Sequence, residues 1–555
     1  MENNNDMNSM MYTYGGRAAQ SVGARLWALL LLAILAAGCT KKDELFDEPY
    51  GTGKEPLGIE IDRFKPPVPA SGLPGTTVSI SGSGFLEFKD RIVFRFNGEE
   101  ADIIEVTDNA IKVVVPDYAS TGTTSISIDD IVVFGPQFSV TGLVRLDATF
   151  LPTQGANGNI MQYMPLADGK TIMVGHFTNY DNKGIIRPIN RIVRTFPDGT
   201  YDASLRTGAA ANGGLNAITQ IGDKLFIGGG FSGYDQRTEN ISNLTMLNLN
   251  GTIDTMGVQT WRRPDQEDTT KYFPTFNGGF NSAVDRLYPQ GDQLLATGNF
   301  RYYVSRQYDK PNRLEMRDTV ILDSTEIRQL ARLNQDGSLD RTYRFDASGK
   351  AMAGANGDIR TYMHTEGELA GKLVVFGAFT RFDDQATNYM VRLNPDGTRD
   401  DTFNPGGVGP DYNVYSVSYN ETTGKYTVSG AFRQYNGQAS NNMVQLNADG
   451  THYAGFVPQE FQGGEPRFAR QLDDGLIVVS GDFRTYGGVA RHGFMILNES
   501  GQLAPGYNAT GQFRGNLNDV VETRSADSRR ALLLIGSFDR FNGEPVSNLA
   551  RITLE

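Results

Sequence analysis

Residues 377–403 have the sequence GAFTRFDDQATNYMVRLNPDGTRDDTF, and this stretch decides the fold. It opens with the pattern Gly-x-Phe-x-x-[Tyr/Phe], continues to an Asp-Gly pair and closes on Asp-x-x-Phe. The opening pattern occurs seven times, and the steps between its glycines are 54, 69, 79, 53, 51 and 55 residues. A recurring unit of this kind is typical of repeat folds, in which one unit cannot bury its apolar face alone. The seven Gly and Phe pairs are Gly175 and Phe177, Gly229 and Phe231, Gly298 and Phe300, Gly377 and Phe379, Gly430 and Phe432, Gly481 and Phe483, and Gly536 and Phe538.

Short β-rich runs flank each copy, and Asp-Gly pairs separate them as hairpin turns do. We expect about four short antiparallel strands per repeat, and seven such repeats predict a β-propeller. The motif Gly is typical of a bulge or of close backbone approach. The Phe and the aromatic residue three positions later are expected to fill the gap between neighbouring blades, because a ligand platform has no need of seven copies.

The whole pattern resembles the delta-60 repeats of bacterial secreted and surface proteins. The resemblance covers 143–555, and residues 377–403 carry it most fully. The last repeat stops after Arg551 and lacks the Asp-x-x-Phe piece, whereas one such piece stands alone at Asp147, before the first repeat. The register therefore predicts that the N-terminal end of the propeller completes the C-terminal blade.

The N-terminus predicts a lipid anchor. Residues 26–37 form an apolar run that fits a secretory signal sequence and is too short to span a bilayer. The run ends at Cys39, the sole cysteine, in a context that resembles a bacterial lipobox, so 1–38 is expected to be a signal peptide. A sole cysteine leaves no partner for a disulfide within the chain.

The segment after Cys39 carries an export signal and a tether. Lys42, Asp43 and Glu44 resemble the signal that sends Bacteroidetes lipoproteins to the outer face of the outer membrane. The polar composition of 39–56 predicts a flexible tether. The resemblance implies an outer-membrane protein, anchored by lipid, that faces the cell exterior.

Residues 57–140 are expected to form a separate β-sandwich, because short strands recur there about every ten residues between Gly and Pro turns. The segment resembles the IPT/TIG immunoglobulin-like domain. The predicted fold class is therefore all-β, an IPT/TIG sandwich followed by a seven-bladed propeller. The domain order resembles accessory lipoproteins of Bacteroidetes nutrient-uptake loci.

Composition and motifs exclude several functions. The net charge of −13 argues against nucleic-acid binding. The four histidines stand at no metal-ligand spacing, and the sequence has no P-loop, nucleophile elbow or dinucleotide fingerprint, so no metal, cofactor or catalytic residue is assigned. Carboxylates from different blades can still meet in space, as in propeller glycosidases. Those considered are Asp62, Asp285, Asp482 and Asp539.

The departures from the repeat are the candidate binding loops. Two repeats are oversized, and their extra residues are rich in Trp, Tyr and Arg, the residue types enriched at binding hot spots. Strand alternation allows the two insertions to emerge on opposite faces of the ring. The candidate residues are Trp261, Arg262, Arg263, Tyr272, Tyr302 and Tyr308.

Three functions stay open. The first is a non-catalytic surface lipoprotein that binds a glycan or peptide nutrient, or supports a TonB-dependent uptake complex of the SusC/SusD-like kind. The second is a propeller hydrolase or lyase acting on polysaccharide or peptide. The third is a structural scaffold with protein partners alone.

Overall fold

The described part of this computed structural model comprises residues 58–152, 154–237, 240–260, 269–307 and 321–555. The signal sequence, Cys39, the Lys42–Glu44 signal and the tether lie outside these residues, as do Trp261, Arg262, Arg263 and Tyr308. Strands dominate, and one 3-10 turn, Leu86–Phe88, is the helical element among the described residues. The predicted all-β class is confirmed. None of the described helical segments is long and apolar enough to cross a membrane.

Two sheets form the N-terminal part of the described chain. Alternate residues of their strands are fully buried, among them Val78 and Ile80 in one sheet and Phe94 and Phe96 in the other. The first sheet has the order β1 (Glu60–Ile61), β3 (Thr77–Ser83), β7 (Ala110–Val114), β6 (Ile103–Val106). The second has the order β2 (Ser71–Gly72), β9 (Ile131–Val140), β8 (Gly122–Ile128), β4 (Ile92–Phe96), β5 (Glu99–Ala101).

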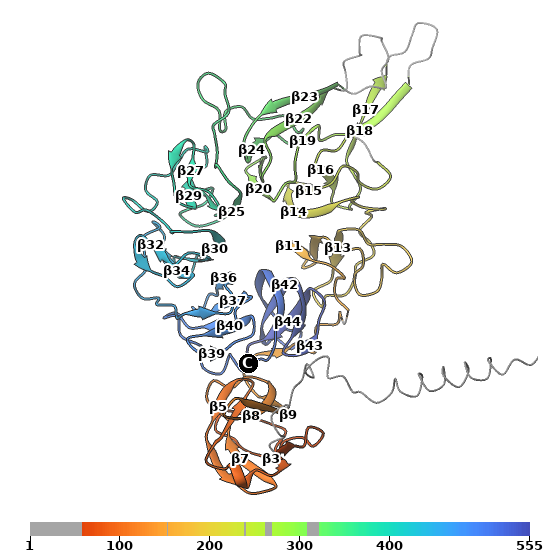
Figure 1. The fold of residues 1–555 in the computed structure, drawn as a ribbon. Coiled ribbons are helices and arrows are strands. Elements are labelled where there is room, and N and C mark those ends of the chain that lie inside the picture. Colours follow the sequence, from red (N-terminus) through yellow and green to blue (C-terminus); the bar gives the residue numbers. More distant parts are fainter. Residues whose placement is uncertain (1–57, 153, 238–239, 261–268, 308–320) are drawn as a thin grey trace, which may run out of the picture. The chain divides into compact units, whose positions relative to one another are not determined.

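The repeats form a closed circle of sheets, numbered here in chain order from sheet 1 to sheet 7 (Figure 1). The first strand of each sheet lies innermost, next to the first strands of the neighbouring sheets. Sheets 1 to 3 are β11 (Ile160–Pro165), β12 (Thr171–Gly175), β13 (Ile192–Thr195); β14 (Gly214–Ile221), β15 (Lys224–Gly230), β16 (Leu244–Asn248); and β20 (Arg286–Gln290), β21 (Gln293–Thr297), β24 (Leu330–Leu333).

Sheets 4 to 6 repeat this order of an inner, a middle and an outer strand. They are β25 (Ile359–Met363), β26 (Leu373–Gly377), β29 (Met390–Leu393); β30 (Val414–Asn420), β31 (Lys425–Gly430), β34 (Met443–Asn447); and β36 (Pro466–Gln471), β37 (Ile477–Gly481), β40 (Phe494–Leu497).

The circle closes through the N-terminal segment. β10 (Arg145–Leu146) pairs antiparallel with β44 (Leu549–Thr553), which pairs with β42 (Arg530–Phe541) and through it with β41 (Arg514–Arg524) in sheet 7. Arg551 Nε then donates to Asp147 Oδ2 at 2.5 Å, and both side chains are buried. The predicted completion of the last sheet by N-terminal residues is confirmed.

The motif residues form the core between the sheets, as predicted. Each motif Phe is at most 4 % exposed, and so is each aromatic residue three positions on. Phe432 and Tyr435 of sheet 5 pack against Val374 and Phe376 of sheet 4, and the other copies repeat this pattern around the circle.

The motif Gly permits a close backbone approach, as predicted. At Gly430 an added Cβ would lie 2.3 Å from the carbonyl oxygen of Asn413, where the register of β30 and β31 shifts by one residue. In all seven copies the corresponding carbonyl lies within 2.1 to 2.7 Å. A side chain has no room at this position, which explains the invariance of Gly within the chain.

The sequence predicts about four short strands per repeat. Among the described residues each of sheets 1 to 6 has three strands, and some repeats add further short strands that pair outside these sheets. The residues after the outer strand form turns instead. In residues 394–402, the carboxylates of Asp396 and Asp400 accept bonds from the Thr two positions on, so these backbone groups are satisfied without a ladder. Parts of the motif form separate short hairpins, such as β27 (Arg381–Phe382) with β28 (Gln385–Ala386).

Candidate functional site

The two insertions join at their bases. The hairpin of β17 (Thr255–Thr260) and β18 (Thr269–Pro274) runs into β19 (Gly278–Phe280), which pairs with β22 (Tyr302–Gln307) of the second insertion. β22 pairs in turn with β23 (Ile321–Glu326), and Figure 1 shows both insertions beyond the outer strands of sheets 2 and 3. Strand β19 therefore ties the first insertion to the second at their bases.

Two of the six candidate loop residues lie within the described residues. Tyr272, on β18, is 62 % exposed, and Tyr302, on β22, is 36 % exposed. Arg301 lies 5.6 Å from the centre of the Tyr302 ring, so this ring already has a cationic neighbour.

A second group of polar residues lies where the inner strands begin, and we call this end of the circle the mouth. The middle residue of the motif lies here and bridges to the next sheet in two repeats. His176 Nε2 lies 3.0 Å from Asn216 Oδ1 of sheet 2, and Asn299 Oδ1 accepts a bond from the Ile359 amide of sheet 4. The side chain of His176 therefore contacts the neighbouring sheet.

An arc of charged and aromatic side chains continues around the mouth from Arg286 of sheet 3 through sheets 4, 5 and 6. Arg360 Nη1 donates to the carbonyl of Tyr415 at 2.9 Å, and the Tyr415 hydroxyl donates to Glu465 Oε2 at 2.9 Å. Burial and this bond raise the pKa of Tyr415. The guanidinium of Arg467 lies 4.4 Å from the centre of the Tyr415 ring and binds both oxygens of Asp482 at 3.1 and 3.0 Å. These contacts join sheet 4 to sheet 5 and sheet 5 to sheet 6.

Two arginines of the arc keep free hydrogen-bonding capacity. Arg286 donates to the carbonyls of Asn216 and Asp285, and Arg360 to that of Tyr415. Among the described residues, no carboxylate lies within 4.0 Å of either guanidinium. Arg360 is exposed to solvent yet surrounded by protein, as a channel-lining side chain is, and this partial burial together with the charge of Arg286 lowers its pKa.

Asp285 lies beside these arginines without a direct ion pair in the described part of the chain. Burial raises its pKa, while the charges of Arg286 and Arg360 act in the opposite direction. The side chains here thus combine hydrogen-bond donors with an acceptor of perturbed acidity, an arrangement found at functional sites and also in structural ion networks.

The arc ends at a pocket of about 270 Å³ between sheets 6 and 7. Asp482, Arg484, His492 and Arg514 contribute its charged and polar groups, and backbone at three glycines forms part of the wall. Burial lowers the pKa of His492, as do the charges of Arg491 and Arg484, so the imidazole is neutral at pH 7.

The carboxylates considered for catalysis have different partners. Asp62 caps a turn of the N-terminal sheets by accepting bonds from the amides of residues 64 and 65. Asp482 and Asp539 are each held by an arginine, Arg467 and Arg514 respectively. Among the described residues no cluster of three or more His, Cys, Asp or Glu side chains could hold a metal ion.

Family models match parts of the chain. One, described as "Domain of unknown function (DUF5008)", covers residues 35–136. Another, "Domain of unknown function (DUF5122) beta-propeller", covers 371–403 and 422–451, which include parts of the fourth and fifth repeats. These matches support a propeller protein. No curated protein matches the sequence.

Several solved structures resemble the chain at low identity. The WD40 β-propeller domain of Doa1 is 14 % identical with a TM-score of 0.36, over 74 % of this chain and 96 % of that one. An auxiliary nutrient binding protein from Bacteroides ovatus is 13 % identical with a TM-score of 0.18, over 67 % and 94 %. Another from Bacteroides thetaiotaomicron is 14 % identical with a TM-score of 0.19, over 66 % and 96 %. At these TM-scores the resemblances carry no argument about a ligand.

Proposed function

We propose that the protein is a non-catalytic lipoprotein of the outer membrane, exposed at the cell surface, that binds a polar nutrient at the mouth. In this proposal 1–38 is the signal peptide, Cys39 carries the lipid and 39–56 is the tether. Residues 57–140 form an IPT/TIG domain, and 143–555 form a seven-bladed propeller of delta-60-like repeats. The nutrient is a glycan or a peptide, delivered to a TonB-dependent uptake complex of the SusC/SusD-like kind.

The observation that carries the binding role is the arc at the mouth. Arg286 and Arg360 offer guanidinium donors that no carboxylate neutralises among the described residues. The pocket beside Asp482 lies at the end of the same arc. Binding sites combine a concave surface with a few fixed polar groups, and side chains locked by neighbouring sheets provide such groups without an entropic cost of ordering.

Affinity electrophoresis tests the binding role. The purified protein is run through native gels that contain neutral or acidic polysaccharides, and a peptide panel is titrated in parallel. Loss of one hydrogen bond to a charged group costs about 1.5–3 kcal/mol, so Arg360→Ala is expected to weaken retention roughly 10- to 150-fold.

The matched control is Arg91→Ala, which removes an exposed ion pair with Asp129 in the N-terminal sheets. If the Arg360→Ala and Arg91→Ala variants bind a polysaccharide or peptide with equal affinity, the binding site does not lie at the mouth. Circular dichroism confirms that both variants fold.

Protease treatment of intact cells tests the location. A surface-exposed lipoprotein is removed from intact cells, whereas a protein that persists until the outer membrane is breached faces the periplasm. Replacing Cys39 with Ser is expected to release the protein from the membrane fraction.

The second candidate is a propeller hydrolase or lyase, favoured by the raised pKa of Asp285 beside two arginines. Release of products from glycan or peptide panels by the wild-type protein, lost in Asp285→Asn, would establish it. The third hypothesis is a structural scaffold. Co-purification of a transporter in mild detergent, with no glycan or peptide bound by the protein, would favour it.

A further inference from the structure

One cross-strand pair differs between sheet 1 and all other sheets. In sheets 2 to 7, the middle and outer strands place two large apolar side chains opposite each other, and both are buried. In sheet 1 the same register holds Thr171 opposite Thr195. The six apolar pairs are Leu225 with Leu247, Leu294 with Leu333, Leu373 with Leu393, Tyr426 with Leu446, Ile477 with Leu497, and Leu532 with Ile552.

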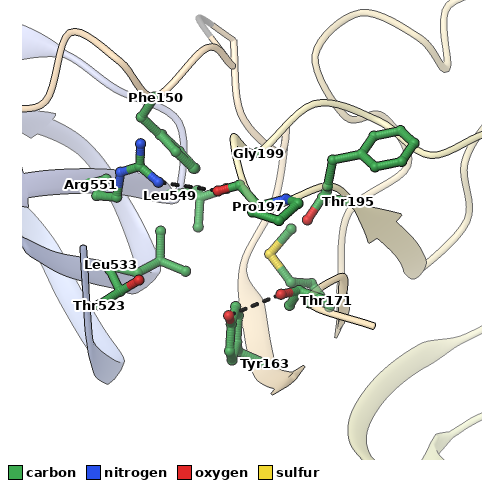
Figure 2. A pocket seen from close by; sticks show the side chains of 13 residues that line it. Phe150, Tyr163, Thr171, Thr195, Pro197, Gly199, Thr523, Leu533, Leu549 and Arg551 are labelled. Atoms are coloured by element: carbon green, nitrogen blue, oxygen red, sulfur yellow. Dashed lines mark hydrogen bonds between the residues drawn. The ribbon is translucent and has the colours of Figure 1, made fainter. Parts of the chain in front are cut away.

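The small threonine pair leaves a cavity of about 100 Å³ at the seam where sheet 7 meets sheet 1 (Figure 2). In the seam between sheets 4 and 5, the ring of Tyr426 fills the corresponding space and its hydroxyl accepts a bond from Arg392. No residue of the described chain takes that place at Thr171. The cavity is present because both members of this cross-strand pair are threonine in sheet 1.

The cavity has an apolar wall and a hydroxyl wall. Met173, Leu533 and Leu549 contribute apolar surface from both sheets. On the other side, the Thr171 hydroxyl donates to the Tyr163 hydroxyl at 2.9 Å. The Thr195 hydroxyl has no hydrogen-bond partner within the described structure, although Thr195 is 3 % exposed and lines the cavity.

A cavity with unused hydroxyl capacity destabilises a protein unless something fills it. Its lining forfeits dispersion contacts, and the Thr195 hydroxyl offers a hydrogen bond that no described protein group uses. An apolar cavity of about 150 Å³ is known to bind benzene. The seam cavity is smaller, is open to solvent on one side and offers a hydroxyl as well.

We propose that the seam cavity is a binding site for a small neutral amphiphile, with an apolar body of about four to seven non-hydrogen atoms and one hydroxyl or carbonyl oxygen. The apolar body contacts Met173, Leu533 and Leu549. The oxygen exchanges a hydrogen bond with Thr195. This site is separate from the mouth and does not depend on the function proposed there.

Phenol and benzene are the test probes, because they share a ring and differ in one hydroxyl. The protein is labelled with ¹³C in its methionine methyl groups, and the Met173 resonance is followed while each probe is titrated to its solubility limit. We expect saturable shifts with a millimolar Kd for phenol. Benzene is expected to bind about 2- to 10-fold more weakly, since it lacks the hydrogen bond.

Two double variants separate shape from chemistry. Thr171→Leu with Thr195→Leu installs the pair that sheets 2, 3 and 4 carry, so the fold is expected to persist while phenol binding weakens at least tenfold. Thr171→Val with Thr195→Val keeps the cavity and removes its threonine hydroxyls, so phenol affinity is expected to fall to that of benzene. A Met173 resonance that neither probe moves, or equal shifts in the Leu variant, would overturn the proposal.

Discussion

The ion pair that closes the circle provides the sharpest prediction about stability. Asp147 precedes the first repeat and Arg551 lies in the last strand, yet their side chains meet at 2.5 Å and are 0 % and 5 % exposed. Asp147→Asn keeps the size of the side chain and removes its charge, which leaves the Arg551 guanidinium buried without its counter-ion. Breaking a buried pair in this way costs about 3–5 kcal/mol. The lower end applies here, because an amide oxygen still accepts the bonds from Thr149.

Two measurements test this value. Urea denaturation followed by circular dichroism gives the free energy of unfolding, expected to fall by about 3 kcal/mol. Hydrogen exchange read by mass spectrometry locates the loss, and a local cost of this size lowers protection of β10 and β44 by about 100-fold. Asp129→Asn is the control, because its pair with Arg91 has more than half of both side chains exposed and is expected to contribute at most about 1 kcal/mol.

A cost below about 1 kcal/mol for Asp147→Asn would refute this reasoning, and so would a loss of protection spread evenly over all sheets. A double replacement, Asp147→Leu with Arg551→Met, is expected to cost less than Asp147→Asn alone. It removes the desolvation penalty of both charges, and apolar replacements of buried pairs are often neutral.

Three further predictions concern the repeats. Gly430→Ala is expected to cost about 3 kcal/mol, the upper end for an overpacked core, because its Cβ would meet the Asn413 carbonyl at 2.3 Å. The Cβ of Gly437→Ala meets nothing within 4 Å, and this variant is expected to cost about 1 kcal/mol through its positive φ. Urea denaturation compares the two variants. Tyr435→Phe is expected to cost about 1–3 kcal/mol by the same assay, because its hydroxyl donates at 2.7 Å to the buried carbonyl of an Asp-Gly turn. Burial opposes ionisation of Asp340, but its hydrogen bonds lower the pKa to about 2. The contribution of the Asp340 carboxylate to folding stability is therefore complete above the unfolded-state pKa of about 4 and is lost as the pH falls toward 2. Acid titration of Asp340→Asn is expected to show a shallower loss of stability below pH 4 than the wild-type protein shows.

The sequence was sufficient to predict the core but not its hydrogen bonds. Seven copies of one pattern identify the Gly, Phe and Tyr positions, because the same residue types pack between neighbouring sheets in each repeat. The pattern does not show why Tyr is preferred at the last position. In five repeats its hydroxyl donates to the Gly carbonyl of the turn after the outer strand, which is Asp-Gly in three repeats, Asn-Gly in one and Ser-Gly in one. The five residues are Tyr180, Tyr234, Tyr303, Tyr435 and Tyr486.

The fourth repeat shows how the same carbonyl is satisfied without a tyrosine. Phe382 has no hydroxyl, and Arg344 Nη1 donates to the Gly397 carbonyl at 3.1 Å instead. Arg344 also binds both oxygens of Asp383 and lies 4.9 Å from the centre of the Phe382 ring. Arg344 stands well before Phe382 in the chain, so no local pattern could have revealed this replacement.

The mouth could not be predicted for a related reason. Arg360, Tyr415 and Arg467 come from three different repeats, each directly after the residue that pairs with the motif Gly, and the residue type at this position varies among the repeats. Their contacts depend on how far each inner strand is rotated against the next, which is a property of the closed circle. The sequence instead drew attention to the insertions, whose length is visible without any knowledge of packing. Of the candidates named from them, the described residues show Tyr272 and Tyr302, and those two side chains are exposed.

A comparison of equivalent positions within one chain distinguishes two kinds of departure. An insertion beyond the outer strands adds residues without disturbing the core, so tolerance alone explains it. The threonine pair of sheet 1 is different, because it replaces two apolar side chains at a position that six other sheets keep buried and apolar. The two threonines bury less apolar surface than the apolar pairs of the other sheets do, and both changes fall in one cross-strand pair. A departure that lowers stability needs a compensating gain, and a ligand that fills the cavity supplies one through mass action. The internal departure at Thr171 and Thr195 is therefore the stronger indication of a binding site, although the insertions are longer.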